Sequence, residues 1–119
     1  MKFKWTTIQV TNLDNSLKFY KDLLGMKIAT VIEGGNHPIV MLGEDEDAKI
    51  ELIPISTASR ENLGNGVSIG IAFKNLDDLV EKIKSKGIPI VGPITPMPDI
   101  RFFFVNDPDG YTIQLLDED

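Results

Sequence analysis

Short apolar or alternating stretches run along the chain, and most are bounded by glycine, proline, asparagine or aspartate. Stretches of this length and composition are typical of β-strands. Together they predict strands over residues 4–10, about 26–32, 37–43 and 48–54, and then over 67–73, about 88–91, 100–106 and 111–116.

Two stretches change to apolar residues at every third or fourth position, which is the spacing of a helix with one buried face. The first begins behind Asn12 and Asp14, which are suitable helix-capping residues, and it ends at Gly25. The second begins behind Asn75 and ends at Gly87. The pattern therefore predicts one helix after the first strand and another after the fifth.

Part of the sequence is repeated. Asn12-Leu13-Asp14-Asn15 returns as Asn75-Leu76-Asp77-Asp78, a shift of 63 positions, and the same shift places Ile50-Glu51-Leu52 on Ile113-Gln114-Leu115. Matches that recur in the same order indicate an internal duplication. We predict an α+β fold with one domain over residues 1–119, made of two βαβββ modules at about 1–55 and 67–119 and a polar linker at about 56–66.

The last two predicted strands are joined by Asp107-Pro108-Asp109-Gly110. Proline fixes φ at about −65° and glycine accepts a positive φ, so these residues predict a tight turn with a defined register. The prolines at positions 89, 93, 96 and 98 predict an irregular segment before Arg101. We expect this segment to be a loop that covers the mouth of a cavity.

Composition and charge exclude several classes of function. The chain has no cysteine, so disulfides, thiolate zinc sites and cysteine nucleophiles are excluded. A formal charge of −6 and scattered lysines disfavour nucleic acid as a partner. No apolar run has the length of a signal peptide or a membrane span, so we expect a cytoplasmic protein with no membrane partner. Hydrolase and nucleotide-binding motifs are absent from the sequence.

The two ends of the chain carry recognisable motifs. The first is Val10-Thr11-Asn12-Leu13-Asp14-Asn15-Ser16 followed by Phe19-Tyr20 and Leu24-Gly25, and the second is Asp107-Pro108-Asp109-Gly110-Tyr111-Thr112-Ile113-Gln114-Leu115. These motifs resemble the vicinal oxygen chelate superfamily, which includes glyoxalase I, extradiol dioxygenases, fosfomycin-resistance enzymes and bleomycin-binding proteins. The resemblance implies two βαβββ modules whose curled mixed sheets enclose a central cavity, and a homodimer.

Members of this superfamily that bind a metal ion place four ligands on the first and last strands of the modules. The resemblance implies Trp5, Glu51, Ser68 and Gln114 at these positions, and the repeat relates them in two pairs, each by a shift of 63. Glu51 is a good ligand, but an indole offers only an N–H donor and a serine hydroxyl is a weak neutral ligand. We therefore expect no metal and no other cofactor, with a divalent metal ion as the alternative.

Two further residues carry groups suited to binding. His37 is the only histidine, and we expect it to be an exposed turn residue rather than a ligand, because it follows Asn36 and precedes Pro38. Arg101 alternates onto the same strand face as Phe103. It either points inward, as a bidentate clamp for a carboxylate or a phosphate, or outward into solvent, and the sequence leaves both orientations open.

Two functions are compatible with these residues. In the first, the protein binds a small molecule without a metal in the cavity between the modules: Trp5 forms a buried apolar wall, and Glu51, Ser68, Arg101 and Gln114 make polar contacts. In the second, it is a glyoxalase I-like lyase/isomerase or a dioxygenase-like enzyme, with Glu51 as the catalytic base or a metal ligand. The sequence leaves open whether the protein is an enzyme. A subunit with no ligand is a third possibility, and it predicts an occluded cavity.

Overall fold

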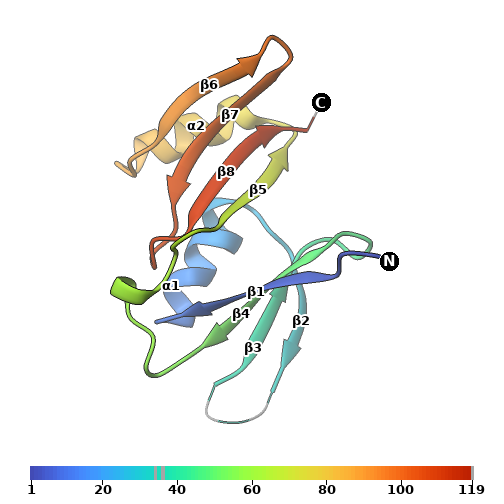
Figure 1. Cartoon of the computed structure of the whole chain (residues 1–119), viewed down its shortest axis with the longest axis vertical. Coiled ribbons are helices and arrows are strands. Elements are labelled where there is room, and N and C mark those ends of the chain that lie inside the picture. Colours follow the sequence, from blue (N-terminus) through green and yellow to red (C-terminus); the bar gives the residue numbers. More distant parts are fainter. Residues whose placement is uncertain (34, 36, 119) are drawn as a thin grey trace. The chain divides into compact units, whose positions relative to one another are not determined.

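The computed structural model describes residues 1–33, 35 and 37–118 of the chain. It divides into two compact units, Met1–Leu63 and Gly64–Asp119. Each unit contains a strand, a helix and then three strands, as the internal repeat predicts (Figure 1). No helix in the described part of the chain is long and apolar enough to cross a membrane.

The first unit begins with a strand and a capped helix. Its elements are β1 (Trp5–Val10), α1 (Leu13–Leu17) with its π-helical continuation η1 (Lys18–Leu23), β2 (Ile28–Ile32), β3 (Ile39–Leu42) and β4 (Lys49–Pro54). The Asn12 side chain accepts a hydrogen bond from the Asn15 N–H, so the predicted cap is present. Gly25 follows the helical segment with a φ of +82°, a conformation that glycine adopts more readily than any other residue.

The four strands of the first unit form one mixed sheet in the order β1-β4-β3-β2. β1 and β4 are parallel neighbours, and the remaining pairs are antiparallel. The helix α1 packs on β4 and covers one face of the sheet. The core beneath it contains Ile8, Val10, Tyr20, Leu23, Val40, Leu42, Ile50 and Leu52. Removing this apolar surface from water stabilises the unit by about 25 cal/mol for each Å² buried.

The second unit repeats this topology. Its elements are β5 (Ser68–Phe73), α2 (Leu76–Ser85), β6 (Val91–Met97), β7 (Ile100–Asn106) and β8 (Thr112–Asp117), and the sheet order is β5-β8-β7-β6. The linker before it holds a short 3-10 helix, η2 (Arg60–Asn62). α2 packs on β8 and buries Leu76, Leu79, Val80 and Ile83, the residues on its predicted apolar face.

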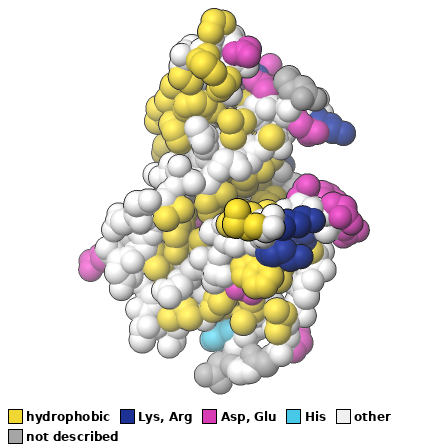
Figure 2. All heavy atoms as spheres, turned by 45° about the vertical axis from the view of Figure 1, so that its right-hand side comes forward, with side chains coloured by type: hydrophobic (Ala, Val, Ile, Leu, Met, Phe, Trp, Pro, Cys, Tyr) yellow, Lys and Arg dark blue, Asp and Glu magenta, His cyan; other side chains and the backbone are white. Residues whose placement is uncertain are grey.

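The proline-containing segment before Arg101 is a strand, so the prediction of an irregular loop over a cavity mouth is wrong. β6 lies at the edge of its sheet and pairs only with β7, with register shifts on both sides of Ile94. An edge strand tolerates proline because a missing N–H on its outer side interrupts no ladder. All of β6 is exposed, and hydrophobic side chains gather on this part of the surface at the top of Figure 2.

The turn between β7 and β8 has the predicted chemistry. The Gly110 N–H donates to the Asp107 carbonyl oxygen, and Gly110 has a φ of +91°. The buried Asp107 carboxylate accepts hydrogen bonds from the N–H groups of Asp109 and Tyr111, both at 2.9 Å. These bonds fix the register in which β7 and β8 pair.

Candidate functional site

The sheet of the first unit has a second face, opposite the one that α1 covers. Along β1 and β4 the fully buried residues occur at every second position, so the intervening residues point to the other side. These include Trp5, Thr7, Lys49 and Glu51, and Met41 on β3 pairs with Glu51. We call these five residues the open face of the first unit. Two of the five, Trp5 and Glu51, are site residues predicted from the sequence. Thr7 was not predicted, although strand alternation from Trp5 places it on the same face.

Glu51 lies at the centre of the open face, where Thr7 orients its carboxylate. The two residues are direct partners across β1 and β4, and the Thr7 hydroxyl donates a hydrogen bond of 2.6 Å to Glu51 Oε1. This length is typical of a charge-assisted O–H···O⁻ bond. Among the described residues, no hydrogen bond reaches the second carboxylate oxygen, Oε2. That oxygen can accept a hydrogen bond from a ligand.

Trp5 is the diagonal neighbour of Glu51 on the open face, because it pairs with Lys49, two residues before Glu51. It is 49% exposed, so the expectation of a buried apolar wall is wrong. The physical reason is its position: β1 is an edge strand, and the helix of this unit covers the opposite face. The indole lines a pocket of about 270 Å³ together with Phe3 and Met41.

Charged side chains also line this pocket. Lys2, Lys4 and Lys49 line it together with the acidic residues at positions 45–47. The Lys49 ammonium donates to the backbone carbonyl oxygens of Asp45 and Asp47, and it thereby closes the loop between β3 and β4. Figure 2 shows basic, acidic and hydrophobic side chains next to one another at the amino-terminal end of the first unit. The pocket therefore combines apolar side chains with charges of both signs.

The corresponding positions of the second unit carry no charge. Ser68 and Gln114 occupy on β5 and β8 the places that Trp5 and Glu51 occupy on β1 and β4, as the strand registers show. The repeat relates Trp5 to Ser68 and Glu51 to Gln114, and the strand registers place each of these residues at the equivalent position of its own sheet. The prediction that all four residues converge on one cavity stays a prediction.

Gly70 is the partner of Gln114 across β5 and β8, in the place where the first unit has Thr7. It offers no hydroxyl to hold the amide, and an added Cβ would lie 3.5 Å from Gln114 Oε1 and 3.2 Å from Leu116 Cδ1. Phe102 and Phe104 flank this region from β7, with their rings edge to face at 5.3 Å. The second unit therefore presents neutral hydrogen-bonding groups beside an aromatic pair.

Arg101 lies on the face of its sheet that α2 covers, 5.7 Å from the centre of the buried Phe103 ring. It donates two hydrogen bonds to Asp117, at 2.9 and 2.7 Å, and one to Asp77 at 2.8 Å. The hydrogen bonds that Arg101 donates to Asp117, and then the one to Asp77, raise the pKa of Arg101, and those to Asp117 lower the pKa of that carboxyl. The guanidinium fork thus holds carboxylates of its own chain, and we do not propose it as a ligand contact.

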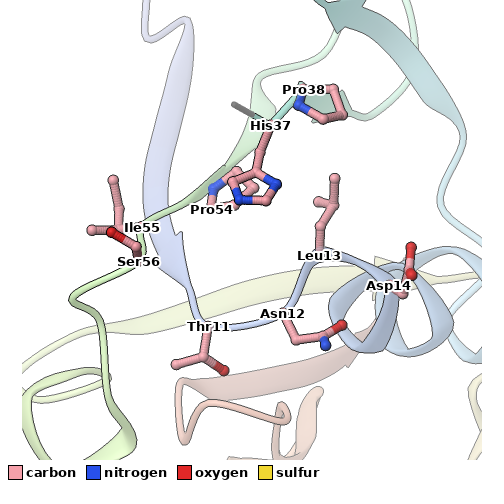
Figure 3. A pocket seen from close by; sticks show the side chains of 9 residues that line it. All are labelled: Thr11, Asn12, Leu13, Asp14, His37, Pro38, Pro54, Ile55 and Ser56. Atoms are coloured by element: carbon pink, nitrogen blue, oxygen red, sulfur yellow. The ribbon is translucent and has the colours of Figure 1, made fainter. Parts of the chain in front are cut away.

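His37 is exposed, in a bend before Pro38, which is the environment expected from the sequence. It lines a second pocket of about 320 Å³, which includes residues that follow β1 and residues at the end of β4 (Figure 3). Three separated segments of the chain contribute to this pocket, and no local pattern in the sequence indicates it.

Four positions carry the metal ligands in metal-binding members of the superfamily that the sequence resembles. The residues at these positions here, Trp5, Glu51, Ser68 and Gln114, do not fit a divalent metal ion. The first unit offers one carboxylate beside an indole whose nitrogen only donates, and the second unit offers a hydroxyl and an amide. Within residues 1–33, 35 and 37–118, no group of three or more histidine, cysteine, aspartate or glutamate side chains is placed to hold a metal ion. The open face therefore offers an aromatic surface, one oriented carboxylate, and the Lys49 ammonium, which already donates to the carbonyl oxygens of Asp45 and Asp47.

Comparison with known proteins gives consistent matches over the whole chain. The model of the Glyoxalase/Bleomycin resistance protein/Dioxygenase superfamily matches residues 2–115. A probable lactoylglutathione lyase from Synechocystis is 35% identical, over 93% of this chain and 91% of that protein. The trypanothione-dependent glyoxalase I of Leishmania major superposes with a TM-score of 0.79 at 30% identity, over 99% of this chain and 87% of that one. An antibiotic-binding protein from Streptomyces shares the fold, with a TM-score of 0.74 at 17% identity over 98% and 95% of the two chains.

Proposed function

The chain belongs to the glyoxalase/bleomycin resistance protein/dioxygenase superfamily, and from that premise we propose that it binds a small molecule without a metal ion. The binding surface in this proposal is the open face of the first unit. The observation that carries it is the half-exposed Trp5 beside a carboxylate that Thr7 holds in place. A large apolar side chain left exposed next to a few polar groups is the usual composition of a ligand site. The antibiotic-binding protein of the same fold supports this use of the scaffold.

The groups on the open face favour a ligand that combines an apolar ring with a positive charge. An indole face attracts cations through its quadrupole, and Glu51 adds a negative charge beside it. Met41 supplies a flexible thioether surface that adapts to ligands of different shape. On the corresponding face of the second unit, Ser68 and Gln114 offer neutral hydrogen bonds.

Fluorescence titration of the chelator-treated protein tests the proposal. Trp5 is the only tryptophan, so all tryptophan emission reports on the open face. Benzyltrimethylammonium, which joins an aromatic ring to a quaternary cation, should change this emission saturably, and benzenesulfonate should not. Adding nickel or zinc should leave the dissociation constant unchanged. A response that requires added metal, or that the anion reproduces, would contradict metal-free binding at Glu51.

A lyase of the lactoylglutathione type is the second candidate, and the names of the curated relatives favour it over simple binding. Glu51 would act as the base that removes a proton from the carbon next to a carbonyl, with its orientation fixed by Thr7. The negative charge that develops on the substrate oxygen needs strong hydrogen-bond donors or a cation nearby. The residues present do not fit a metal ion that would supply this charge, and for this reason we place the lyase second.

Turnover of the hemithioacetal of methylglyoxal and glutathione separates the two candidates. The binding proposal predicts no thioester formation above the spontaneous rate, either after chelation or with added nickel or zinc. Turnover that disappears in Glu51→Gln and persists in Glu61→Gln, a change in the exposed linker, would establish the lyase instead.

A further inference from the structure

The linker before β5 contains Asn65-Gly66, and Asn65 is the only asparagine in the sequence that a glycine follows. The two residues form an exposed turn between η2 and the start of β5 at Ser68. In such a pair the backbone nitrogen of the glycine can attack the side-chain carbonyl of the asparagine. Glycine hinders this attack less than any other residue, because it has no Cβ beside the nitrogen.

The structure leaves both reacting groups unoccupied. Among the described residues, the Asn65 side chain makes no hydrogen bond and the Gly66 N–H donates none. Apart from the adjoining residues, no atom lies within 4 Å of the point that a Cβ on Gly66 would occupy. The five-membered ring that the attack forms therefore meets no neighbouring group on this side of the turn.

Asn62, three residues earlier in the same linker, is protected. Its Oδ1 atom accepts hydrogen bonds from the Ser59 N–H at 3.0 Å and from the Ser59 hydroxyl at 3.2 Å. The residue after it is Leu63, whose side chain crowds the nitrogen that would attack. Both asparagines lie in one tryptic peptide, residues 61–74, so they can be compared directly.

We propose that Asn65 is a modification site at which the folded protein undergoes spontaneous deamidation. The Gly66 nitrogen forms a bond to Asn65 Cγ and gives up its proton, and the side-chain nitrogen takes up that proton and leaves as ammonia. Water then opens the resulting succinimide at either carbonyl, which yields aspartate or isoaspartate. Both products carry a new carboxylate, and isoaspartate also adds one carbon atom to the backbone. The reaction consumes only water.

The extra backbone atom enters a short segment that is held at both ends. Gly64 packs against the turn between β7 and β8, where an added Cβ would lie 2.6 Å from the Gly110 carbonyl oxygen. Ser68 is fixed by its pairing with Thr112. We expect isoaspartate to displace one of these two contacts. The modification does not depend on the function proposed for the open face.

Incubation of the full chain in mildly alkaline buffer tests the proposal, because the deprotonated amide nitrogen is the attacking species. Tandem mass spectrometry of the tryptic peptide 61–74 should place the modification at Asn65 and leave Asn62 intact. An isoaspartate-specific methyltransferase should label the same peptide. The folded chain should react within roughly tenfold of the rate of the free peptide 61–74, because the turn restricts the backbone of only one or two residues.

Two variants locate the reaction. Asn65→Gln should stop ammonia release from the linker, because the corresponding six-membered ring forms much more slowly. Asn75→Gln, at the start of α2 where the asparagine side chain makes no capping hydrogen bond, is the matched control and should leave the rate unchanged. NMR of the isoaspartate product should show shifted amide signals at Ser68 or Gly110.

Three results would overturn the proposal: an intact Asn65 in the folded chain when the free peptide reacts, modification of Asn62 as fast as that of Asn65, or undiminished ammonia release in Asn65→Gln. Unchanged amide signals at both Ser68 and Gly110 in the isoaspartate product would overturn the inferred displacement.

Discussion

Thr7 and Glu51 lie directly opposite each other on β1 and β4, and the Thr7 hydroxyl donates a hydrogen bond of 2.6 Å to the Glu51 carboxylate. The duplicated unit has Gly70 and Gln114 in these places, with no side chain to hold the amide. The two halves of the chain share a strand register, and the chemistry of this pair differs between them. At this pair of positions the first unit therefore carries an oriented charge and the second does not.

Removing the Thr7 hydroxyl should loosen the Glu51 carboxylate without disturbing the fold. Thr7 is exposed and valine suits a strand, so Thr7→Val should change the free energy of unfolding by less than about 0.5 kcal/mol. Binding of benzyltrimethylammonium should weaken about twofold, because part of the carboxylate orientation is lost. Thr7→Ser keeps the hydroxyl and should bind like the wild type. Equal affinity in Thr7→Val would show that the hydrogen bond has no role in binding.

The accessibility of Trp5 is directly measurable. Since the residue is 49% exposed, acrylamide should quench its emission efficiently in the native protein, and unfolding should shift the emission only slightly to the red. Saturating benzyltrimethylammonium should reduce the quenching constant, because the ligand covers part of the ring. Native emission that is strongly blue-shifted and resists quenching would mean that the indole is covered, contrary to the exposure described.

The Asp107 carboxylate should be important for stability. Its Oδ1 atom accepts two backbone hydrogen bonds in a buried turn, so Asp107→Ala leaves those N–H groups without this acceptor. We expect the free energy of unfolding to fall by about 1–3 kcal/mol in chemical denaturation. Asp107→Asn retains an acceptor oxygen and should lose less. Asp99→Ala, at an exposed turn, is the control, and a loss in that variant as large as in Asp107→Ala would contradict the assignment.

The Arg101–Asp117 pair should make part of the stability pH-dependent. Hydrogen bonding by Arg101 lowers the pKa of Asp117 below its unfolded value of about 3.9. A group whose pKa is lowered by folding stabilises the native state above the unfolded pKa, and this stabilisation is lost as the pH falls through the folded pKa.

At neutral pH, Asp117→Asn should therefore lower Tm by roughly 1–5 °C, as expected for a partly exposed ion pair in a small domain. The difference from the wild type should shrink as the pH falls below the folded pKa. Glu118→Gln, at the exposed neighbouring position, should show no such difference. A Tm difference that is constant across this pH range would exclude the ion pair as its cause.

Features that depend on local chemistry could be predicted from the sequence. The repeated Asn-Leu-Asp motif marks the start of both helical segments, and Asp107-Pro108-Asp109-Gly110 forms the turn expected of it. The shift that relates Glu51 to Gln114 predicted their equivalent strand positions, because duplicated strands keep their register.

Features that depend on position within a sheet could not be predicted. The prolines of β6 indicate a loop when taken alone, but a strand at the edge of a sheet accommodates them. A large apolar side chain such as the Trp5 indole is usually buried, but Trp5 lies on an edge strand and on the face that α1 does not cover. The His37 pocket depends on three connections that only the sheet brings together.

The central claim is that Trp5 and Glu51 form a binding surface that needs no metal ion. The most direct measurement is an NMR titration of the chelator-treated protein with benzyltrimethylammonium, followed at the Trp5 indole N–H in the wild type and in Glu51→Gln. We predict a saturable shift in the wild type and an affinity roughly twofold to fivefold lower in Glu51→Gln, because one exposed charge interaction is removed. An indole signal that does not respond, or an identical affinity in the two proteins, would contradict the claim.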